Sequence, residues 1–400
     1  MRWSLQQDAA LQAVAQWRRD PGDKQVFALF GYAGTGKSTI AKHAAEGEDS
    51  SNEAILYATY TGKAAHVLRQ KGIPAQTIHS LIYVPTEKSR LRLAELEQQL
   101  VAKAVEFGDP EDPRLEPIRQ QIREERKVLS RPSFTLNPDS ILRQASLVVI
   151  DECSMVDARM GEDLLSFGVP ILVLGDPAQL PPVGGGGFFT EREPDVVLTE
   201  IHRQAADSPI IRLATYARNK QPLPLGKHGD SMVINTRPED PLGYDQILVG
   251  KNKTRSASNH RVRTLKGIDS ALPVSGDKLV CLRNDHELGL LNGAIWHVAH
   301  SVPHSDERIY LSLNSDEGAL IDVEAHTAHF LGKAEALPWW ERKEAQELDY
   351  GYAITVHKSQ GSQWKDILLI DESSVFRQDA WRHLYTGITR AAERICVVQR

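Results

Sequence analysis

A glycine-rich segment that ends in lysine and serine is the strongest chemical signal in the sequence. Residues Gly31–Thr39 read G-Y-A-G-T-G-K-S-T and directly follow the apolar run Val26–Phe30. In such a pattern, backbone N–H groups and the start of the next helix surround phosphate oxygens, the lysine reaches the outer phosphates and the hydroxyl binds Mg²⁺. The alternative, a glycine turn with a chance Lys-Ser, is opposed by the strand before it and the helix after it. We therefore expect a nucleotide-binding P-loop with contacts from Gly34, Thr35, Gly36, Lys37, Ser38 and Thr39, of which Ser38 is also a metal ligand.

Two adjacent carboxylates, Asp151 and Glu152, end another apolar run. This arrangement is typical of metal-assisted phosphoryl transfer, in which Asp151 would hold Mg²⁺ and Glu152 would orient and deprotonate the attacking water. A solvated turn after the strand is the alternative. A third loop, Gly175–Val183, is stiffened by prolines on both sides of Gln179, which indicates a phosphate sensor.

Apolar runs typical of buried parallel strands recur in the first half of the chain, at 26–30, 54–57, 146–150 and 170–174. A loop rich in Gly, Asp or Thr follows each run. Ligands of such sheets bind beyond the carboxyl ends of the strands, so we expect these loops to meet at one site. The pattern predicts an α/β fold.

The amino-acid composition changes at two places in the rest of the chain. Residues 84–131 are charged and rich in Leu and Gln, which predicts two inserted helices, and a packed hairpin is favoured over a partner-binding coiled coil. Four glycines precede a second α/β region, in which short alternating strands predict a small β module. The expected units are a first domain at 1–83 and 132–185 with the insertion 84–131, and a second domain at 186–293 and 348–400 with the insertion 294–347.

Length and composition limit the class of protein. The 400 residues are 41% hydrophobic, which is enough for two or three domains with buried cores. No signal-peptide core and no apolar stretch of about 20 residues occurs in the sequence, so we expect a cytoplasmic protein without a membrane segment. The three separated cysteines, Cys153, Cys281 and Cys396, predict neither a disulfide framework nor a zinc site.

The net charge of −6 argues mildly against a nucleic-acid partner, because binding to a phosphate backbone needs basic clusters. One short polar stretch nevertheless gathers six basic residues, namely Lys251, Lys253, Arg255, Arg261, Arg263 and Lys266. Such a stretch can follow a phosphate backbone or form a solvated basic loop, and the sequence leaves both open.

In their order along the chain, these motifs resemble the RecD-like branch of superfamily 1 helicases, which includes the phage Dda helicase. The resemblance covers most of the chain and is carried by Gln7 with Ala10 and by the segments 31–39, 59–65, 77–81, 151–155, 175–183, 198–204, 352–362 and 384–391. It implies two RecA-like P-loop domains, the first with a helical insertion and the second with a small SH3-like β insertion. It also implies an ATP-dependent DNA helicase that moves 5′ to 3′ on single-stranded DNA, with ATP and Mg²⁺ as cofactors.

The same resemblance implies roles for individual residues. Gln7 would read the adenine edge, and Gln360 with Gly361 would couple the nucleotide to DNA. Arg203 and Arg390 would reach the γ-phosphate from the second domain. Because arginine fingers supply about 10³ to 10⁵ in rate, hydrolysis would then depend on closure of the two domains.

A track for single-stranded DNA is also implied, over Thr61, Lys63 and His79 of the first domain and Thr355, His357 and Lys358 of the second. Threonine and lysine suit phosphate contacts, and the histidines could stack on bases or bond phosphates, with a helix cap or an interdomain hydrogen bond as the alternative. The expected partners are single-stranded DNA, duplex junctions and replication or repair proteins, bound by a monomer.

Two regions depart from the family pattern. The insertion 84–131 stands where relatives carry a strand-separating pin, and only Pro132 and Phe134 are wedge-like residues nearby. In the second insertion, Trp339 and Trp340 could belong to the core or face DNA. The alternative functions are a DNA-stimulated ATPase that does not unwind, alone or in a helicase–nuclease complex, a nucleic-acid clamp with structural ATP, and a small-molecule P-loop kinase.

Overall fold

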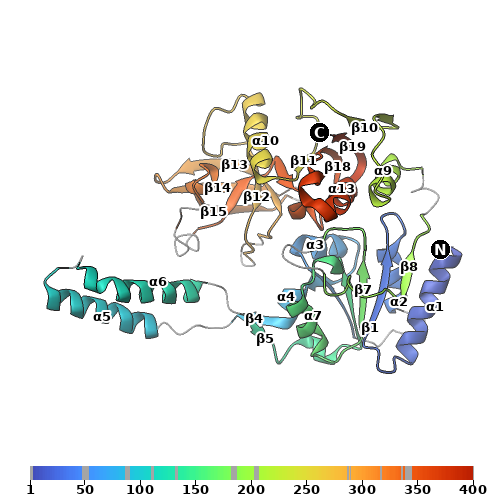
Figure 1. Cartoon of the computed structure of the whole chain (residues 1–400), viewed down its shortest axis with the longest axis horizontal. Helices are drawn as coiled ribbons and strands as arrows, with labels where there is room; N and C mark the ends of the chain where they lie inside the picture. Colours follow the sequence, from blue (N-terminus) through green and yellow to red (C-terminus); the bar gives the residue numbers. More distant parts are fainter. Residues whose placement is uncertain are drawn as a thin grey trace.

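Two α/β domains form the body of the molecule, with a long helical hairpin projecting from the first and a β module packed on the second (Figure 1). The computed structural model describes residues 3–46, 54–85, 91–109, 112–130, 134–181, 187–201, 207–285, 288, 290–315, 318–334, 337 and 345–399. The predicted α/β fold class is confirmed.

The first domain is built on a parallel sheet with the strand order β3-β2-β6-β7-β1-β8. Its strands are β1 (Val26–Gly31), β2 (Ile55–Thr59), β3 (Ala75–Thr77), β6 (Leu147–Asp151), β7 (Ile171–Gly175) and β8 (Val196–Leu198). The central strands are buried on both faces, because their apolar runs are nearly continuous. One face is covered by α1 (Leu5–Arg19), α2 (Lys37–Glu46) and α3 (Gly62–Gln70), and the other by α4 (Ile78–Ile82) and α7 (Ala158–Leu165).

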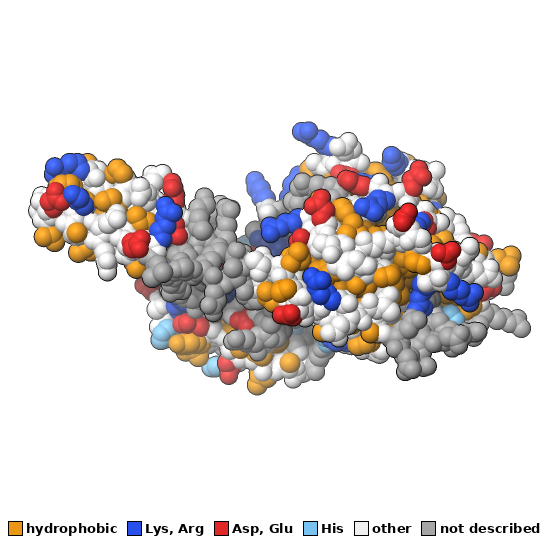
Figure 2. Space-filling view, turned by 90° about the horizontal axis from the view of Figure 1, so that it is seen from below, with side chains coloured by type: hydrophobic (Ala, Val, Ile, Leu, Met, Phe, Trp, Pro, Cys, Tyr) orange, Lys and Arg blue, Asp and Glu red, His pale blue; other side chains and the backbone are white. Residues whose placement is uncertain are grey.

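The helical hairpin leaves the first domain through a two-stranded antiparallel ribbon, β4 (Tyr83–Pro85) and β5 (Phe134–Leu136). Its helices are α5 (Leu91–Phe107) and α6 (Glu116–Ser130), which contact each other and extend away from the body (Figure 1). Few apolar side chains are buried between them, and Val101 and Val105 are exposed. Basic and acidic side chains are interspersed on the surface of the hairpin (Figure 2). The contact between α5 and α6 is what we expect of the packed hairpin that the sequence favours over a partner-binding coiled coil.

The second domain has a sheet with the order β17-β11-β18-β19-β10-β9, parallel except for the pairing of β9 with β10. Its strands are β9 (Gly226–His228), β10 (Ser231–Ile234), β11 (Gln246–Val249), β17 (Ala353–Thr355), β18 (Trp364–Ile370) and β19 (Ala391–Val398). One face packs against α9 (Pro209–Arg218) and α13 (Ala380–Ile388), and the other against α10 (Asn252–Leu265). The amino ends of β18 and β19 lie next to a cleft between the two domains, which Gly361, Ser362, Gln363, Thr389 and Arg390 line from this side.

The β module is an antiparallel sheet with the order β15-β14-β13-β12-β16. Its strands are β12 (Lys278–Cys281), β13 (Ile295–Pro303), β14 (Arg308–Ser315), β15 (Leu320–His326) and β16 (Leu348–Tyr350), and α11 (Thr327–Phe330) follows β15. The module therefore begins before and ends after the expected range 294–347, because β12 and β16 pair with each other at its edge. Trp339, Trp340 and Pro132 lie outside the described residues.

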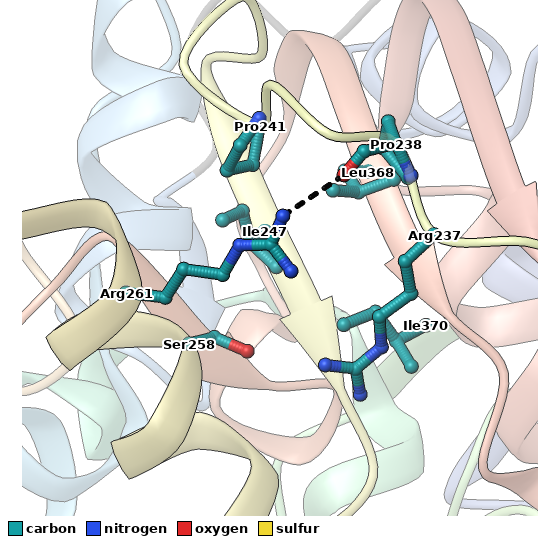
Figure 3. A pocket seen from close by; sticks show the side chains of 8 residues that line it. All are labelled: Arg237, Pro238, Pro241, Ile247, Ser258, Arg261, Leu368 and Ile370. Carbon is teal, nitrogen blue, oxygen red and sulfur yellow. Dashed lines mark hydrogen bonds between the residues drawn. The ribbon is translucent and has the colours of Figure 1, made fainter. Parts of the chain in front are cut away.

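The basic stretch predicted as a possible loop is the helix α10, and much of its charge is used inside the protein. Arg255 pairs with Asp349 at 2.7 Å. Arg261 donates to the carbonyl oxygens of Glu239 at 2.9 Å and Pro238 at 3.5 Å, beside a small pocket with an apolar floor (Figure 3). Of the two alternatives that the sequence left open, the solvated loop does not describe this stretch, because it is helical and its arginines are anchored by partners distant in sequence.

Arg263 of α10 makes a buried ion pair with Asp277 at the start of β12, with Nε and Nη2 each 3.0 Å from a carboxylate oxygen. The same guanidinium donates to the carbonyl oxygens of Ser270 and Leu272. The pair therefore fixes α10 to the β module.

We predict that Asp277→Ala lowers the free energy of unfolding by about 3–5 kcal/mol, because it leaves a buried guanidinium without its counter-charge. Urea unfolding of the purified chain measures this. The matched control is Asp366→Ala, which removes the partly exposed carboxylate paired with Arg394 at 2.8 Å and should cost about 1 kcal/mol or less. Equal losses for the two variants would contradict the prediction.

Candidate functional site

The P-loop has the backbone that its glycines predict. Gly34 and Gly36 adopt left-handed conformations with φ of 82° and 80°, which residues with side chains rarely adopt. A Cβ on Gly31 would lie 2.6 Å from Thr35 Oγ1 and 2.9 Å from Leu198 Cβ. The loop leads directly into the first turn of α2, so its amides and the helix start form the cradle expected for phosphate.

Lys37 lies at the centre of this cradle and is held by oxygen atoms of the loop itself. Its Nζ donates to the carbonyl oxygens of Gly31 at 2.5 Å and Tyr32 at 3.0 Å. It also lies 3.9 Å from Asp176 Oδ2, a carboxylate that is almost completely buried. Burial raises the pKa of Asp176, while the positive charge of Lys37 acts in the opposite direction. Thr39 lies in the first turn of the same helix, and the side chain of Ser38 lies outside the described part of the structure.

The acidic pair lies where β6 ends. Asp151 is the last residue of the strand, and its Oδ1 accepts a hydrogen bond from the backbone N–H of Glu152 at 2.8 Å. Glu152 adopts a left-handed conformation with φ of 55°, which is uncommon for a residue with a side chain. Such strain is often found at functional sites, where it directs a side chain into the site.

One cleft collects the predicted catalytic residues that the structure describes. A cavity of about 300 Å³ between the two domains is lined by Lys37, Asp151, Glu152, Asp176, Gln179, Gly361 and Arg390, among others. The oxygen Oε1 of Gln179 is buried and has no hydrogen-bond partner among the described residues. It can therefore accept a hydrogen bond from a ligand or a water molecule in the cleft.

The second domain contributes Arg390, which is buried at the wall of the cleft. Its guanidinium donates to the carbonyl oxygens of Thr386 at 3.2 Å and Ser362 at 3.4 Å, and to Thr389 Oγ1 at 3.3 Å. These acceptors orient the group without neutralising its charge. Arg203, the other predicted arginine, lies outside the described residues.

Gln360 and Gly361 lie at the contact between the domains. The side-chain amide of Gln360 donates to the carbonyl oxygen of Leu180 at 3.0 Å. Gly361 has φ of 73°, and a Cβ there would lie 2.7 Å from Thr61 Oγ1 of the first domain. A glycine is required at this position both by the backbone and by the close approach of the two domains.

Gln7 is buried against the P-loop. Its side chain completes a capping box with Ser4 at the start of α1, and its Nε2 donates to the carbonyl oxygen of Thr35 at 3.2 Å. The adjacent Gln6 accepts hydrogen bonds from the backbone N–H groups of Thr199 and Glu200, both at 2.9 Å. The first turn of α1 thus connects the P-loop to the segment after β8.

The predicted DNA residues of the first domain all have contacts within the protein. Thr61 caps α3, with its Oγ1 accepting from the backbone N–H of Ala64 at 3.2 Å. The ammonium group of Lys63 lies 4.6 Å from the ring centre of Trp364 in the second domain. The ring of His79 makes an edge contact with Phe134 at 4.2 Å, at the base of the helical hairpin.

In the second domain, Thr355 Oγ1 accepts from the backbone N–H of Lys358 at 3.4 Å. His357 lies 5.3 Å from Phe376 between ring centres, and burial lowers the pKa of His357 below its ordinary value. His357 is therefore neutral at pH 7 and suited to stacking or hydrogen bonding, whereas the side chain of Lys358 is exposed. Because Gly361 contacts Thr61, the two halves of the predicted track meet at the interdomain contact.

Sequence reasoning missed two site residues. Asp176 lies in the predicted sensor loop, but nothing in the sequence showed that it would be buried next to Lys37. Tyr385 lies in a segment that carried the family resemblance, and its hydroxyl donates to Asp176 Oδ2 at 2.6 Å. Only the packing of the second domain against the first brings these two residues together.

Two family models match the chain. One is described as an AAA domain and matches residues 3–224, which is more than half of the chain, and the other is a UvrD-like helicase C-terminal domain that matches residues 350–398. In the described part of the chain, no helix has both the length and the apolar character that a bilayer crossing requires.

Among curated proteins, the chain is 25% identical to the ATP-dependent RecD2 DNA helicase of Deinococcus radiodurans, over 92% of this chain and 46% of that protein. It is 23% identical to the conjugal transfer protein TraA of Agrobacterium fabrum, over 98% of this chain and 32% of that protein. The chain thus spans about half or less of the length of these relatives.

Solved structures of Pif1 helicases have a similar fold. A structure of two coordinating Pif1 helicases at forked double-stranded DNA has a TM-score of 0.53 at 18% identity, covering 99% of this chain and 92% of that one. Bacteroides Pif1 bound to single-stranded DNA has a TM-score of 0.52 at 17% identity, with the same coverage of 99% and 92%. At this identity the likeness shows the fold, and it confirms the two RecA-like domains. The chain therefore belongs to the AAA domain family, its residues 350–398 match a UvrD-like helicase C-terminal domain, and it is similar to RecD2 in sequence and to Pif1 helicases in fold.

Proposed function

We propose that the chain is an ATP-dependent DNA helicase motor that translocates on single-stranded DNA as a monomer and couples ATP hydrolysis to strand separation. One observation carries the proposal: a single interdomain cleft holds the P-loop lysine and the acidic pair of the first domain opposite Arg390 of the second. A pocket built from two domains makes hydrolysis depend on how closely they approach.

ATP and Mg²⁺ fit the residues of this cleft. Asp151 and Glu152 line the same cleft as Lys37 of the P-loop, and carboxylate oxygens are the preferred ligands of Mg²⁺. Asp151, with the Ser38 hydroxyl, would hold the metal, which neutralises charge on the transferred phosphoryl group when bound. Gln7 would contact the adenine, and Gly34, Thr35, Gly36 and Thr39 would surround the phosphates.

In this mechanism the protein side chains act on water and on phosphate charge. Glu152 takes a proton from the attacking water. The Oε1 atom of Gln179 accepts a hydrogen bond from the same water and so orients it. Lys37 leaves the carbonyl oxygens of its own loop and binds the outer phosphates. Arg390, joined by Arg203, stabilises the charge that develops on the γ-phosphate.

Coupling to DNA is supported by where the predicted track lies. Thr61 lies next to Gly361, where the two domains approach closely, and the ammonium group of Lys63 lies over the ring of Trp364 in the second domain. A strand that runs over these residues would therefore sense any change in the distance between the domains. RecD2 is named as a DNA helicase and the Pif1 structures contain DNA, which supports single strands and duplex junctions as substrates. The 5′ to 3′ direction and a replication or repair setting rest on the family resemblance.

A second function, DNA-stimulated ATP hydrolysis without unwinding, is favoured by one observation. The place of the strand-separating pin is occupied by a ribbon that carries two long helices, and Phe134 at its base is engaged by His79. Such a chain could translocate alone or as a subunit of a helicase–nuclease complex. Because the matched relatives are about two to three times as long, it could also act as one domain of a longer protein.

The two functions are separated by strand-displacement assays on duplexes with a 5′ or a 3′ single-stranded tail. We predict ATP-dependent unwinding of the 5′-tailed duplex and not of the 3′-tailed one. ATP consumption on single strands with no unwinding of either duplex, even at high protein concentration, would leave the second function.

We predict that Lys37→Ala abolishes ATP turnover, because it removes the ammonium group that the P-loop holds in position for the outer phosphates. Glu152→Gln should slow hydrolysis by about 10²- to 10⁴-fold while nucleotide still binds, since only the base is lost. Fluorescent-nucleotide titration and steady-state hydrolysis measure the two effects, and DNA should stay bound longer to the ATP-loaded Glu152→Gln variant. Normal turnover in Glu152→Gln would exclude Glu152 as the base.

We predict that Arg390→Ala lowers the rate constant of DNA-stimulated hydrolysis by about 10³-fold or more. The matched control is Arg394→Ala, which removes an arginine of β19 that pairs with Asp366 outside the cleft. Its hydrolysis rate should match that of the unaltered chain. If both variants hydrolyse ATP at the normal rate, Arg390 does not act on the phosphate.

A further inference from the structure

The loop after β7 is held at both of its ends by the second domain. At one end, the Tyr385 hydroxyl donates to Asp176 Oδ2 at 2.6 Å. At the other end, the backbone N–H of Leu180 donates to Thr386 Oγ1 at 3.0 Å, and the Leu180 carbonyl accepts from Gln360, also at 3.0 Å.

Gln179 lies between these two anchoring points. Its backbone N–H donates to the carbonyl oxygen of Asp176 at 3.1 Å, and Asp176 Oδ1 accepts from the backbone N–H of Ala178 at 3.0 Å. The loop is thus a compact turn whose shape depends on the Asp176 carboxylate. Moving that carboxylate would move Gln179.

The Tyr385 hydroxyl has a second bond, which reaches the P-loop: it accepts from the backbone N–H of Ala33 at 2.9 Å. The ring of Tyr385 is 1% exposed and belongs to the core of the second domain, so its position follows that domain. One hydroxyl group therefore links the P-loop, the Asp176 turn and the second domain. Asp176 in turn lies 3.9 Å from the ammonium group of Lys37.

We propose that Tyr385 is a positioning residue for ATP hydrolysis, whose hydroxyl sets the place of Asp176, and through it of Gln179, relative to the P-loop. The inference rests on the proposed ATPase function. Docking of the second domain then does more than deliver Arg390, because it also fixes the glutamine on the opposite wall of the cleft. A displacement of about 1 Å in a positioning group can reduce a rate by about 10²-fold, so a two-ended anchor of this kind matters for the chemical step.

Tyr385→Phe removes the hydroxyl and keeps the ring that packs in the core. The buried Asp176 carboxylate then loses a donor, the Ala33 N–H loses an acceptor, and the turn that carries Gln179 is released. The amides of Gly34 and Gly36 and the Lys37 side chain are unchanged. The loss should therefore fall on kcat and not on the binding of ATP.

The experiment measures steady-state ATP hydrolysis of the full chain with saturating single-stranded oligothymidylate. For Tyr385→Phe we expect kcat to fall about tenfold or more, KM for ATP to stay within about twofold, and the affinity for the labelled oligonucleotide to be unchanged. The matched control is Tyr83→Phe, which removes another tyrosine–aspartate hydrogen bond, at 2.5 Å to Asp163, within the first domain. Its kcat should stay within about twofold of normal.

A normal kcat in Tyr385→Phe, or a raised KM with normal kcat, would overturn the inference. A second pair of variants tests the same loop even if Tyr385→Phe does not fold stably. Thr386→Val deletes the acceptor for the Leu180 N–H and should lower kcat, whereas Thr386→Ser retains a hydroxyl and should restore it. Equal rates in these two variants would also contradict the role of the anchored loop.

The unaltered chain distinguishes this inference from the function on which it rests. If it hydrolyses ATP faster with single-stranded DNA and Tyr385→Phe does the same, only the role of Tyr385 is excluded. If the unaltered chain shows no hydrolysis with or without DNA, the proposed function falls and the inference falls with it.

Discussion

The contact between the second domain and the loop after β7 is the interaction on which the rest of the site depends. Through this contact Tyr385, Thr386 and Gln360 meet Asp176 and Leu180, and the same approach brings Arg390 to the cleft that holds Lys37. The core of the second domain includes Ala178 and Leu180 of the first domain, so the two domains share buried apolar surface at this contact. The proposed ATP hydrolysis needs both domains, because the P-loop belongs to the first domain and Arg390 to the second.

The parts of this site that local sequence determines could be predicted. The P-loop follows from glycines that the backbone requires at positive φ, and Asp151 and Glu152 follow from the end of a continuous apolar strand. The parts that depend on packing could not. Asp176 and Tyr385 are 209 residues apart, and the role of the basic stretch of α10 stayed open because its arginines are anchored by distant partners such as Asp277 and Asp349. Short-range patterns carry no information on such pairs.

The proposed DNA track is built into the same interdomain contact. Lys63 of the first domain contacts Trp364 of the second, and Thr61 of the first domain lies close to Gly361 of the second. A DNA strand that binds these residues must therefore compete with contacts between the domains. His79 is similarly engaged by Phe134 at the base of the hairpin. This gives a physical reason for DNA to alter the distance between the domains, and hence the rate at which the cleft hydrolyses ATP. The hairpin itself has few buried apolar side chains among those that the structure describes, and both signs of charge occur on its surface.

The central claim is that the nucleotide is bound by both domains at once. The most direct measurement is a crystal structure of the chain with a non-hydrolysable ATP analogue, Mg²⁺ and single-stranded DNA. It should show the Arg390 guanidinium at hydrogen-bonding distance from the γ-phosphate, with Lys37 moved from the carbonyl oxygens of Gly31 and Tyr32 onto the phosphates. A structure in which the first domain alone contacts the γ-phosphate, with Arg390 still bonded to Thr386, Ser362 and Thr389, would contradict the claim.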